Sequence, residues 1–141
     1  MSSPLPLLLV IAVIIVLGVT GNMFSASPFV IVAQVAAVGL NIWARISFQS
    51  GTFRVTAAPG GATMITRGPY RFIRHPMYSA ALVFIWAGVA SHLSVLTLAI
   101  GIAVTAVCIA RVIVEERLLR AQYPEYLDYS RSTKALIPFV F

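Results

Sequence analysis

Residues 95–114 have the sequence VLTLAIGIAVTAVCIARVIV, an apolar run in which Arg111 is the single charged residue. About 20 predominantly apolar residues are needed to cross the hydrocarbon core of a bilayer as an α-helix. A water-soluble domain has about 25% charged residues, whereas this chain has 10%. The run therefore predicts a membrane-spanning helix, and the composition places the whole 141-residue chain in the membrane class.

Three further apolar runs precede this one. Residues 4–20 and 29–48 are each long enough to span a bilayer, and a turn around Gly21 and Pro28 separates them. The run 76–91 is shorter and starts at Pro76, a residue suited to the first turn of a helix. A turn at residues 91–94 connects it to the apolar run 95–114, whose helix is expected at about 94–117, so these two helices should form an antiparallel hairpin.

The tail, residues 118–141, alternates apolar and aromatic residues with charges, which is typical of a helix lying at the membrane interface. We therefore expect an all-α polytopic membrane protein with a single domain over residues 1–141. It should contain about four transmembrane helices, a C-terminal helical hairpin and an interfacial C-terminal helix.

The basic residues predict the orientation of these helices. The turns at 21–27 and 91–94 contain no Lys or Arg, whereas basic residues gather at the opposite helix ends and in the segment 49–74. The positive-inside rule then places both termini in the cytoplasm of a multi-pass protein, which we expect in the cell inner membrane. The formal net charge of +6 indicates contact with anionic lipid headgroups rather than nucleic acid.

Two polar clusters should meet at the cytoplasmic end of the hairpin, in residues 67–78 and 111–117. Arg111 and Glu115 are four residues apart and share a helix face. They form either an ion pair at a helix end or a site in which Arg111 holds an anion and Glu115 holds a cation. Glu116 and Arg117 should point elsewhere and be solvated.

In the first cluster, His75 is either an interfacial cap of the following helix or part of a site. Tyr70 and Tyr78 are either members of an aromatic belt or ligand contacts. The residue types and spacing alone leave these alternatives open.

The sequence Gly68-Pro-Tyr-Arg-Phe-Ile-Arg-His-Pro-Met-Tyr78 is followed by the apolar hairpin, by Glu115-Glu116-x-x-Leu119 and by Tyr126-x-x-Tyr129. Together these elements resemble the isoprenylcysteine carboxyl methyltransferase family, whose general plan the phospholipid methyltransferases share. The resemblance covers roughly residues 40–141. It implies an integral membrane methyltransferase that uses S-adenosylmethionine.

The resemblance also implies residue roles. Glu115 matches a cofactor-binding carboxylate, and Arg111 matches an arginine on the substrate side, which makes these two the expected catalytic residues. The segment 62–65 occupies the place of a further cofactor-lining segment, although many family members have histidine where Ala62 falls. The remaining expected cofactor contacts are Met64, Ile65, Tyr70, His75, Pro76, Met77 and Tyr78, and no metal ligand is expected.

The expected acceptor is a lipophilic molecule from the bilayer, with a carboxylate of an isoprenoid or prenylcysteine-like lipid in first place. Arg111 would suit such an acceptor through a charge-assisted pair, whereas an amine or hydroxyl would need a general base such as Glu115 or His75. No obligatory protein partner is indicated. The alternatives are an NADPH-dependent membrane sterol or enone reductase, and a non-catalytic membrane subunit.

Overall fold

The computed structural model describes the backbone of residues 5–49 and 64–137, and the side chains of residues 11–47 and 64–137. The described part is helical and has no β-strand beyond one isolated bridge. The elements are α1 (Leu5–Val19), α2 (Pro28–Gln49), the 3-10 helix η1 (Gly68–Arg71), α3 (Pro76–Ser91), α4 (Val95–Gln122) and α5 (Tyr126–Ser132). The fold class is therefore all-α over the described residues, as the sequence predicted.

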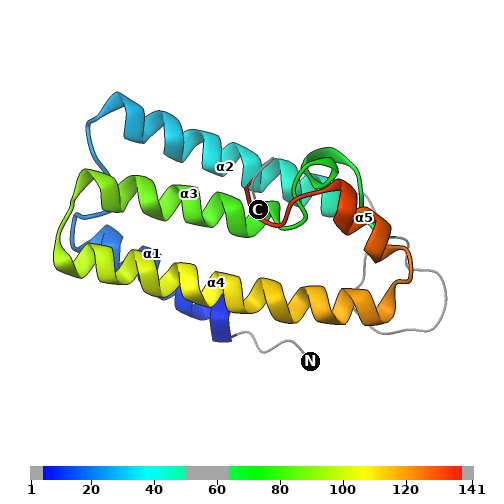
Figure 1. Cartoon of the computed structure of the whole chain (residues 1–141). Coiled ribbons are helices and arrows are strands. Elements are labelled where there is room, and N and C mark those ends of the chain that lie inside the picture. Colours follow the sequence, from blue (N-terminus) through cyan, green and yellow to red (C-terminus); the bar gives the residue numbers. More distant parts are fainter. Residues whose placement is uncertain (1–4, 50–63, 138–141) are drawn as a thin grey trace.

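Helix α3 lies between α2 and the N-terminal part of α4, and α1 lies next to α4 (Figure 1). The core joins α1, α3 and α4 through buried Leu17, Ile85, Val89, Val104 and Cys108. Across the same interface the indole Nε1 of Trp86 donates a hydrogen bond to Thr105 Oγ1 at 3.0 Å. Helix α3 is thus enclosed by its neighbours, and its first turn is held in a fixed place at one end of the bundle.

The outer faces of the bundle are apolar. Long aliphatic and aromatic side chains of α2 and α4 are largely exposed, among them Phe29, Val32, Val95, Leu96 and Ile102. Among the described residues, two helices are long and apolar enough to cross a membrane, Pro28–Ser47 and Val95–Gln122, while Pro76–Ser91 is apolar but shorter. An apolar outer surface of this extent suits lipid rather than water, and these features indicate a membrane protein. That all four long helices cross the bilayer, with both termini in the cytoplasm, stays a prediction.

Helix α4 is longer than the range 94–117 expected from the sequence, because it continues to Gln122. Its start is set by Ser94 and Thr97, whose side chains and backbone N–H groups form a reciprocal capping box. The helix has 28 residues, more than the roughly 20 that one bilayer crossing needs. Its C-terminal turns, which carry Glu115, Glu116 and Arg120, therefore extend beyond the apolar run.

The tail differs from the single interfacial helix expected over 118–141. After α4 the chain turns at Tyr123–Glu125, forms the short helix α5 and then runs beside the segment that precedes α3. Ile73 and Lys134 form a parallel bridge, and Arg74 N donates to the Lys134 carbonyl at 2.7 Å. The expected C-terminal helix is therefore present only as α5, because the backbone groups that follow it pair with this distant segment instead of continuing a helix. Its place at the membrane interface stays a prediction.

Candidate functional site

The two polar clusters expected from the sequence lie together where the start of α3 faces the C-terminal part of α4. The phenol of Tyr78 donates to Glu115 Oε1 at 2.7 Å. Arg111 Nη2 donates to the same oxygen at 3.1 Å, across one turn of α4. The Glu115 side chain keeps 30% of its exposure, so the carboxylate is both fixed in position and accessible.

His75 is the residue that precedes α3, but its side chain does not cap that helix. The imidazole is only 6% exposed and lies between two carboxylates: Nδ1 is 3.7 Å from Glu115 Oε2, and Nε2 is 3.5 Å from Glu116 Oε1. These separations are longer than a hydrogen bond of normal length. His75 is therefore part of the polar cluster and not the side-chain cap that was one reading of the sequence.

Glu116 was expected to be solvated, and that expectation was wrong. Its side chain is 13% exposed, and Oε1 accepts from Arg74 Nε at 2.7 Å, while Arg120 Nη2 lies 3.3 Å from Oε2. The physical reason is the folded-back tail, which covers the face of α4 that would otherwise meet water. Arg74 was also missed, because no spacing in the sequence relates it to Glu116.

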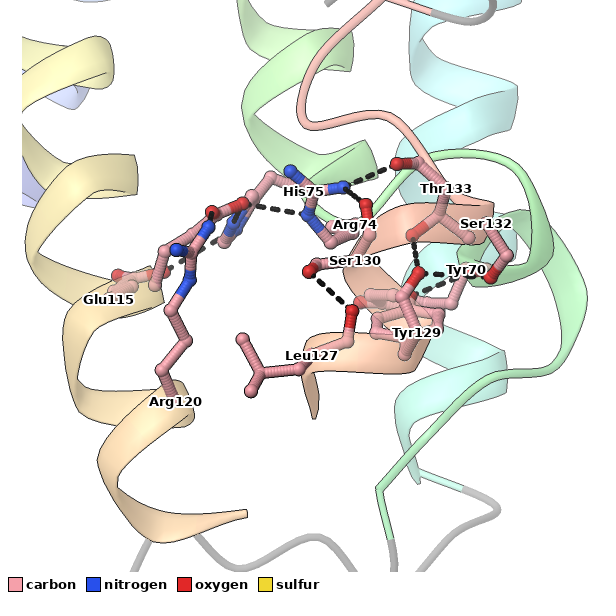
Figure 2. A network of polar contacts seen from close by, with 11 residues as sticks. Tyr70, Arg74, His75, Glu115, Arg120, Leu127, Tyr129, Ser130, Ser132 and Thr133 are labelled. Atoms are coloured by element: carbon pink, nitrogen blue, oxygen red, sulfur yellow. Dashed lines mark hydrogen bonds and ion pairs between the residues drawn. The ribbon is translucent and has the colours of Figure 1, made fainter. Parts of the chain in front are cut away.

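Tyr129 from the tail lies beside Tyr70 on one side of the cluster (Figure 2). Tyr129 donates from its phenol to the Tyr70 carbonyl at 2.7 Å, and its ring packs edge-on against Tyr126. Burial raises the pKa of Tyr70 to about 12, with Arg45 opposing the shift, and burial raises the pKa of Tyr126 to about 12 as well. These phenols therefore remain protonated at neutral pH and act as neutral groups.

The remaining predicted cofactor contacts are distributed around this cluster. Pro76 is buried and Met77 is half-buried, both in the first turn of α3. Met64 and Ile65 are half-buried in the segment before η1. Ala62 and Thr63 lie outside the described residues.

Within the described residues, three buried polar side-chain atoms have no hydrogen-bond partner: His75 Nε2, Arg111 Nε and Tyr126 Oη. Buried polar groups are nearly always hydrogen-bonded, so exceptions call for an explanation such as a ligand. Two of the three belong to residues on either side of Glu115. The cluster thus combines a fixed carboxylate, an imidazole, a guanidinium and aromatic faces at one end of an apolar bundle.

The phospholipid methyltransferase family matches this chain over residues 31–126, which include nearly all of α2 and the whole of η1, α3 and α4. Among curated proteins, the chain is similar to the cobalt-zinc-cadmium resistance protein CzcN of Cupriavidus metallidurans, with 32% identity over 77 residues. It is also similar to the nickel-cobalt-cadmium resistance protein NccN of Alcaligenes xylosoxydans xylosoxydans, with 34% identity over 77 residues.

These alignments cover 54% and 53% of this chain, and 36% of each relative, so the chain spans about a third of the curated relatives it matches. No solved structure matches the chain. The family match covers the segments that carry Tyr78, His75, Arg111 and Glu115. It fits the membrane methyltransferase plan inferred from the sequence, whereas the narrower resemblance to isoprenylcysteine carboxyl methyltransferases stays a prediction. The chain belongs to the phospholipid methyltransferase family.

Proposed function

We propose that this protein transfers a methyl group from S-adenosylmethionine to a lipophilic acceptor, with Glu115 at the centre of the cofactor site. The observation that carries the proposal is the Glu115 carboxylate, which α3 and α4 hold jointly through Tyr78 and Arg111. When bound, S-adenosylmethionine supplies a methyl group on a positively charged sulfur. Its aminoacyl end also carries an ammonium and a carboxylate.

The residues present fit this group. Glu115 Oε1 is engaged by Tyr78 and Arg111, whereas the nearest recorded partner of Oε2 among the described residues is His75 Nδ1 at 3.7 Å. Oε2 can therefore accept a hydrogen bond from an ammonium. The ring of Tyr78 offers a π face to a cation.

The roles of the chain's own residues are positional. Methyl transfer is an in-line displacement, so holding the two reactants in line and excluding water supplies much of the rate. Arg111, with Nη2 on Glu115 and Nε unpaired, has guanidinium donors left for an acidic acceptor. A carboxylate acceptor is already a nucleophile and needs no base, which favours a carboxylate of an isoprenoid or prenylcysteine-like lipid.

The acceptor would enter from the bilayer, because the exposed faces of α2 and α4 are apolar up to the level of the site. Reduction by NADPH is the alternative reaction. The family match favours methyl transfer, and the names of the two relatives concern metal resistance rather than reduction. A non-catalytic subunit is the remaining alternative, and it would bind neither cofactor.

Binding of S-adenosylhomocysteine to the detergent-solubilised protein, measured by calorimetry, tests the proposal. Glu115→Ala and His75→Ala should each weaken binding about tenfold or more, because each removes a polar group from the ligand's surroundings. Asp128→Ala is the matched control, since Asp128 is 85% exposed and outside the cluster. Unchanged affinity in both site variants would refute the site, and affinity for NADPH without affinity for S-adenosylhomocysteine would refute methyl transfer.

A further inference from the structure

We propose that Arg74 and Glu116 are a pair of positioning residues that clamps the C-terminal strap, defined as residues 133–136, and thereby holds His75 against Glu115. The adjacent glutamates of α4 would then have different roles. Glu115 faces the ligand, whereas Glu116 anchors the wall behind His75. The effect on cofactor binding rests on the function proposed above, and the clamp itself does not.

Arg74 is the centre of the clamp (Figure 2). Its Nε donates to Glu116 Oε1 at 2.7 Å, and its Nη1 donates to the carbonyls of Ser130, at 3.0 Å, and Thr133. The Arg74 and Glu116 side chains are only 10% and 13% exposed. One guanidinium thus ties α4 to the end of α5 and to the first residue of the strap, and water screens these contacts little.

The strap is bound to the segment before α3 by backbone hydrogen bonds. Arg74 N donates to the Lys134 carbonyl at 2.7 Å, and His75 N donates to the Ala135 carbonyl at 3.0 Å. Lys134 N donates in return to the Phe72 carbonyl at 3.2 Å, and Ser79 Oγ donates to the Leu136 carbonyl. The position of the His75 backbone therefore depends directly on the strap.

The charge on Glu116 gives the clamp a second effect. The imidazole of His75 lies almost midway between the two carboxylates, at 3.7 Å from Glu115 and 3.5 Å from Glu116. Arg74 neutralises Glu116, so Glu116 attracts the imidazole less than it would alone. Without Arg74, the largely exposed Arg120 would be the remaining arginine partner of Glu116 among the described residues, and the Glu116 carboxylate would compete more strongly with Glu115 for His75.

The experiment is a double-mutant cycle on the full chain in detergent, with Arg74→Gln, Glu116→Gln and the combination. One readout is hydrogen exchange of residues 133–136, and the other is the affinity for S-adenosylhomocysteine. Each single variant should speed exchange of the strap and weaken binding about tenfold. The double variant should lose no more than the larger single loss, because residues that act through one interaction are not additive.

Arg131→Gln with Asp128→Asn is the matched control pair. Its atoms are 3.3 Å apart, its side chains are 80% and 85% exposed, and it lies on the neighbouring helix α5. Exposed pairs of this kind contribute little, so strap exchange and affinity should both match the wild type. Arg74→Lys keeps the charge but not the three-way contact, so it should have an intermediate effect on strap exchange and affinity. It replaces Arg74→Gln in the cycle if hydrogen exchange within α3 shows that the Arg74→Gln protein is globally unfolded.

The outcomes separate the clamp from the proposed function. Unchanged strap exchange in the Arg74 and Glu116 variants would overturn the clamp. Faster strap exchange with unchanged affinity would overturn the positioning of His75, as would additive losses in the double variant. A wild-type protein that does not bind S-adenosylhomocysteine would refute the proposed function, while the exchange measurements would still decide whether the clamp exists.

Discussion

Replacement of Gly68 by alanine tests how the chain enters the site. Gly68 begins η1 and has a φ angle of +61°, in the left-handed region that glycine adopts readily. A Cβ built at this position would lie 2.1 Å from Ser47 Oγ and 3.3 Å from Trp43 Nε1, both on α2. Alanine there must therefore adopt an unfavourable backbone conformation and also displace a side chain of α2.

The two costs can be added. A left-handed residue other than glycine costs about 1–2 kcal/mol, and inserting a methyl group into a packed contact costs about 1–3 kcal/mol. We therefore expect Gly68→Ala to lower the free energy of unfolding by about 2–5 kcal/mol. Since η1 leads directly into His75, the same change should weaken S-adenosylhomocysteine binding.

Thermal unfolding of the detergent-solubilised protein, followed by tryptophan fluorescence, measures this loss, with Trp43 next to the altered position as a local reporter. Gly39→Ala is the matched control, because Gly39 lies within α2 with nothing within 4 Å of its added Cβ. That variant should be as stable as the wild type or more stable by up to about 1 kcal/mol, since alanine favours helix more than glycine does. A Gly68→Ala protein that unfolds at the wild-type temperature would refute the reasoning.

Two further predictions concern the acceptor and pH. Arg111→Ala should leave the affinity for S-adenosylhomocysteine within about threefold of the wild type. It should lower kcat/KM for an acidic lipid acceptor by about 10–100-fold, because a charge-assisted pair is lost. Normal kinetics with that acceptor would remove Arg111 from the substrate role. Burial raises the pKa of Tyr70 and Tyr126 from about 10 to about 12, so the folded state holds these protons more tightly than the unfolded state. The resulting stabilisation of the folded state is complete below about pH 10 and should be lost as pH rises from about 10 to 12. Alkaline denaturation followed by phenolate absorbance would measure this loss. An alkaline transition that is the same in Tyr70→Phe and Tyr126→Phe would contradict the prediction.

The parts of the fold that depend on local chemistry could be inferred from the sequence. The apolar composition and the long apolar runs indicated an all-α membrane protein, and the described structure is helical with two spans of sufficient length. Pro76 begins α3 as expected, because proline acts on the backbone within one turn of itself. The end of α4 was less predictable, since charged residues such as Glu116 and Arg120 can continue a helix beyond its apolar portion.

The tail could not be inferred in this way. Alternating apolar and charged residues after position 118 fit an interfacial helix, and no local signal indicates that residues 133–136 pair with residues 72–75. That pairing depends on contacts between segments some 60 positions apart, such as Ser79 with Leu136 and Tyr129 with Tyr70. Such contacts leave no periodicity in the sequence. The Tyr126-x-x-Tyr129 element was visible as part of a family resemblance, but its structural reason appears only in the fold.

The adjacent glutamates show most clearly where local reasoning fails. Successive residues of a helix point about 100° apart, so Glu115 and Glu116 must face different surroundings. The i to i+4 rule relates Glu115 to Arg111 and Glu116 to Arg120, and both pairs are present. The rule cannot reveal that the strap and Arg74 bury Glu116, because both reach α4 from elsewhere in the chain. If the clamp operates as proposed, the two glutamates should differ in their variants. Glu115→Gln should reduce ligand affinity without loosening the strap, whereas Glu116→Gln should reduce ligand affinity and loosen the strap.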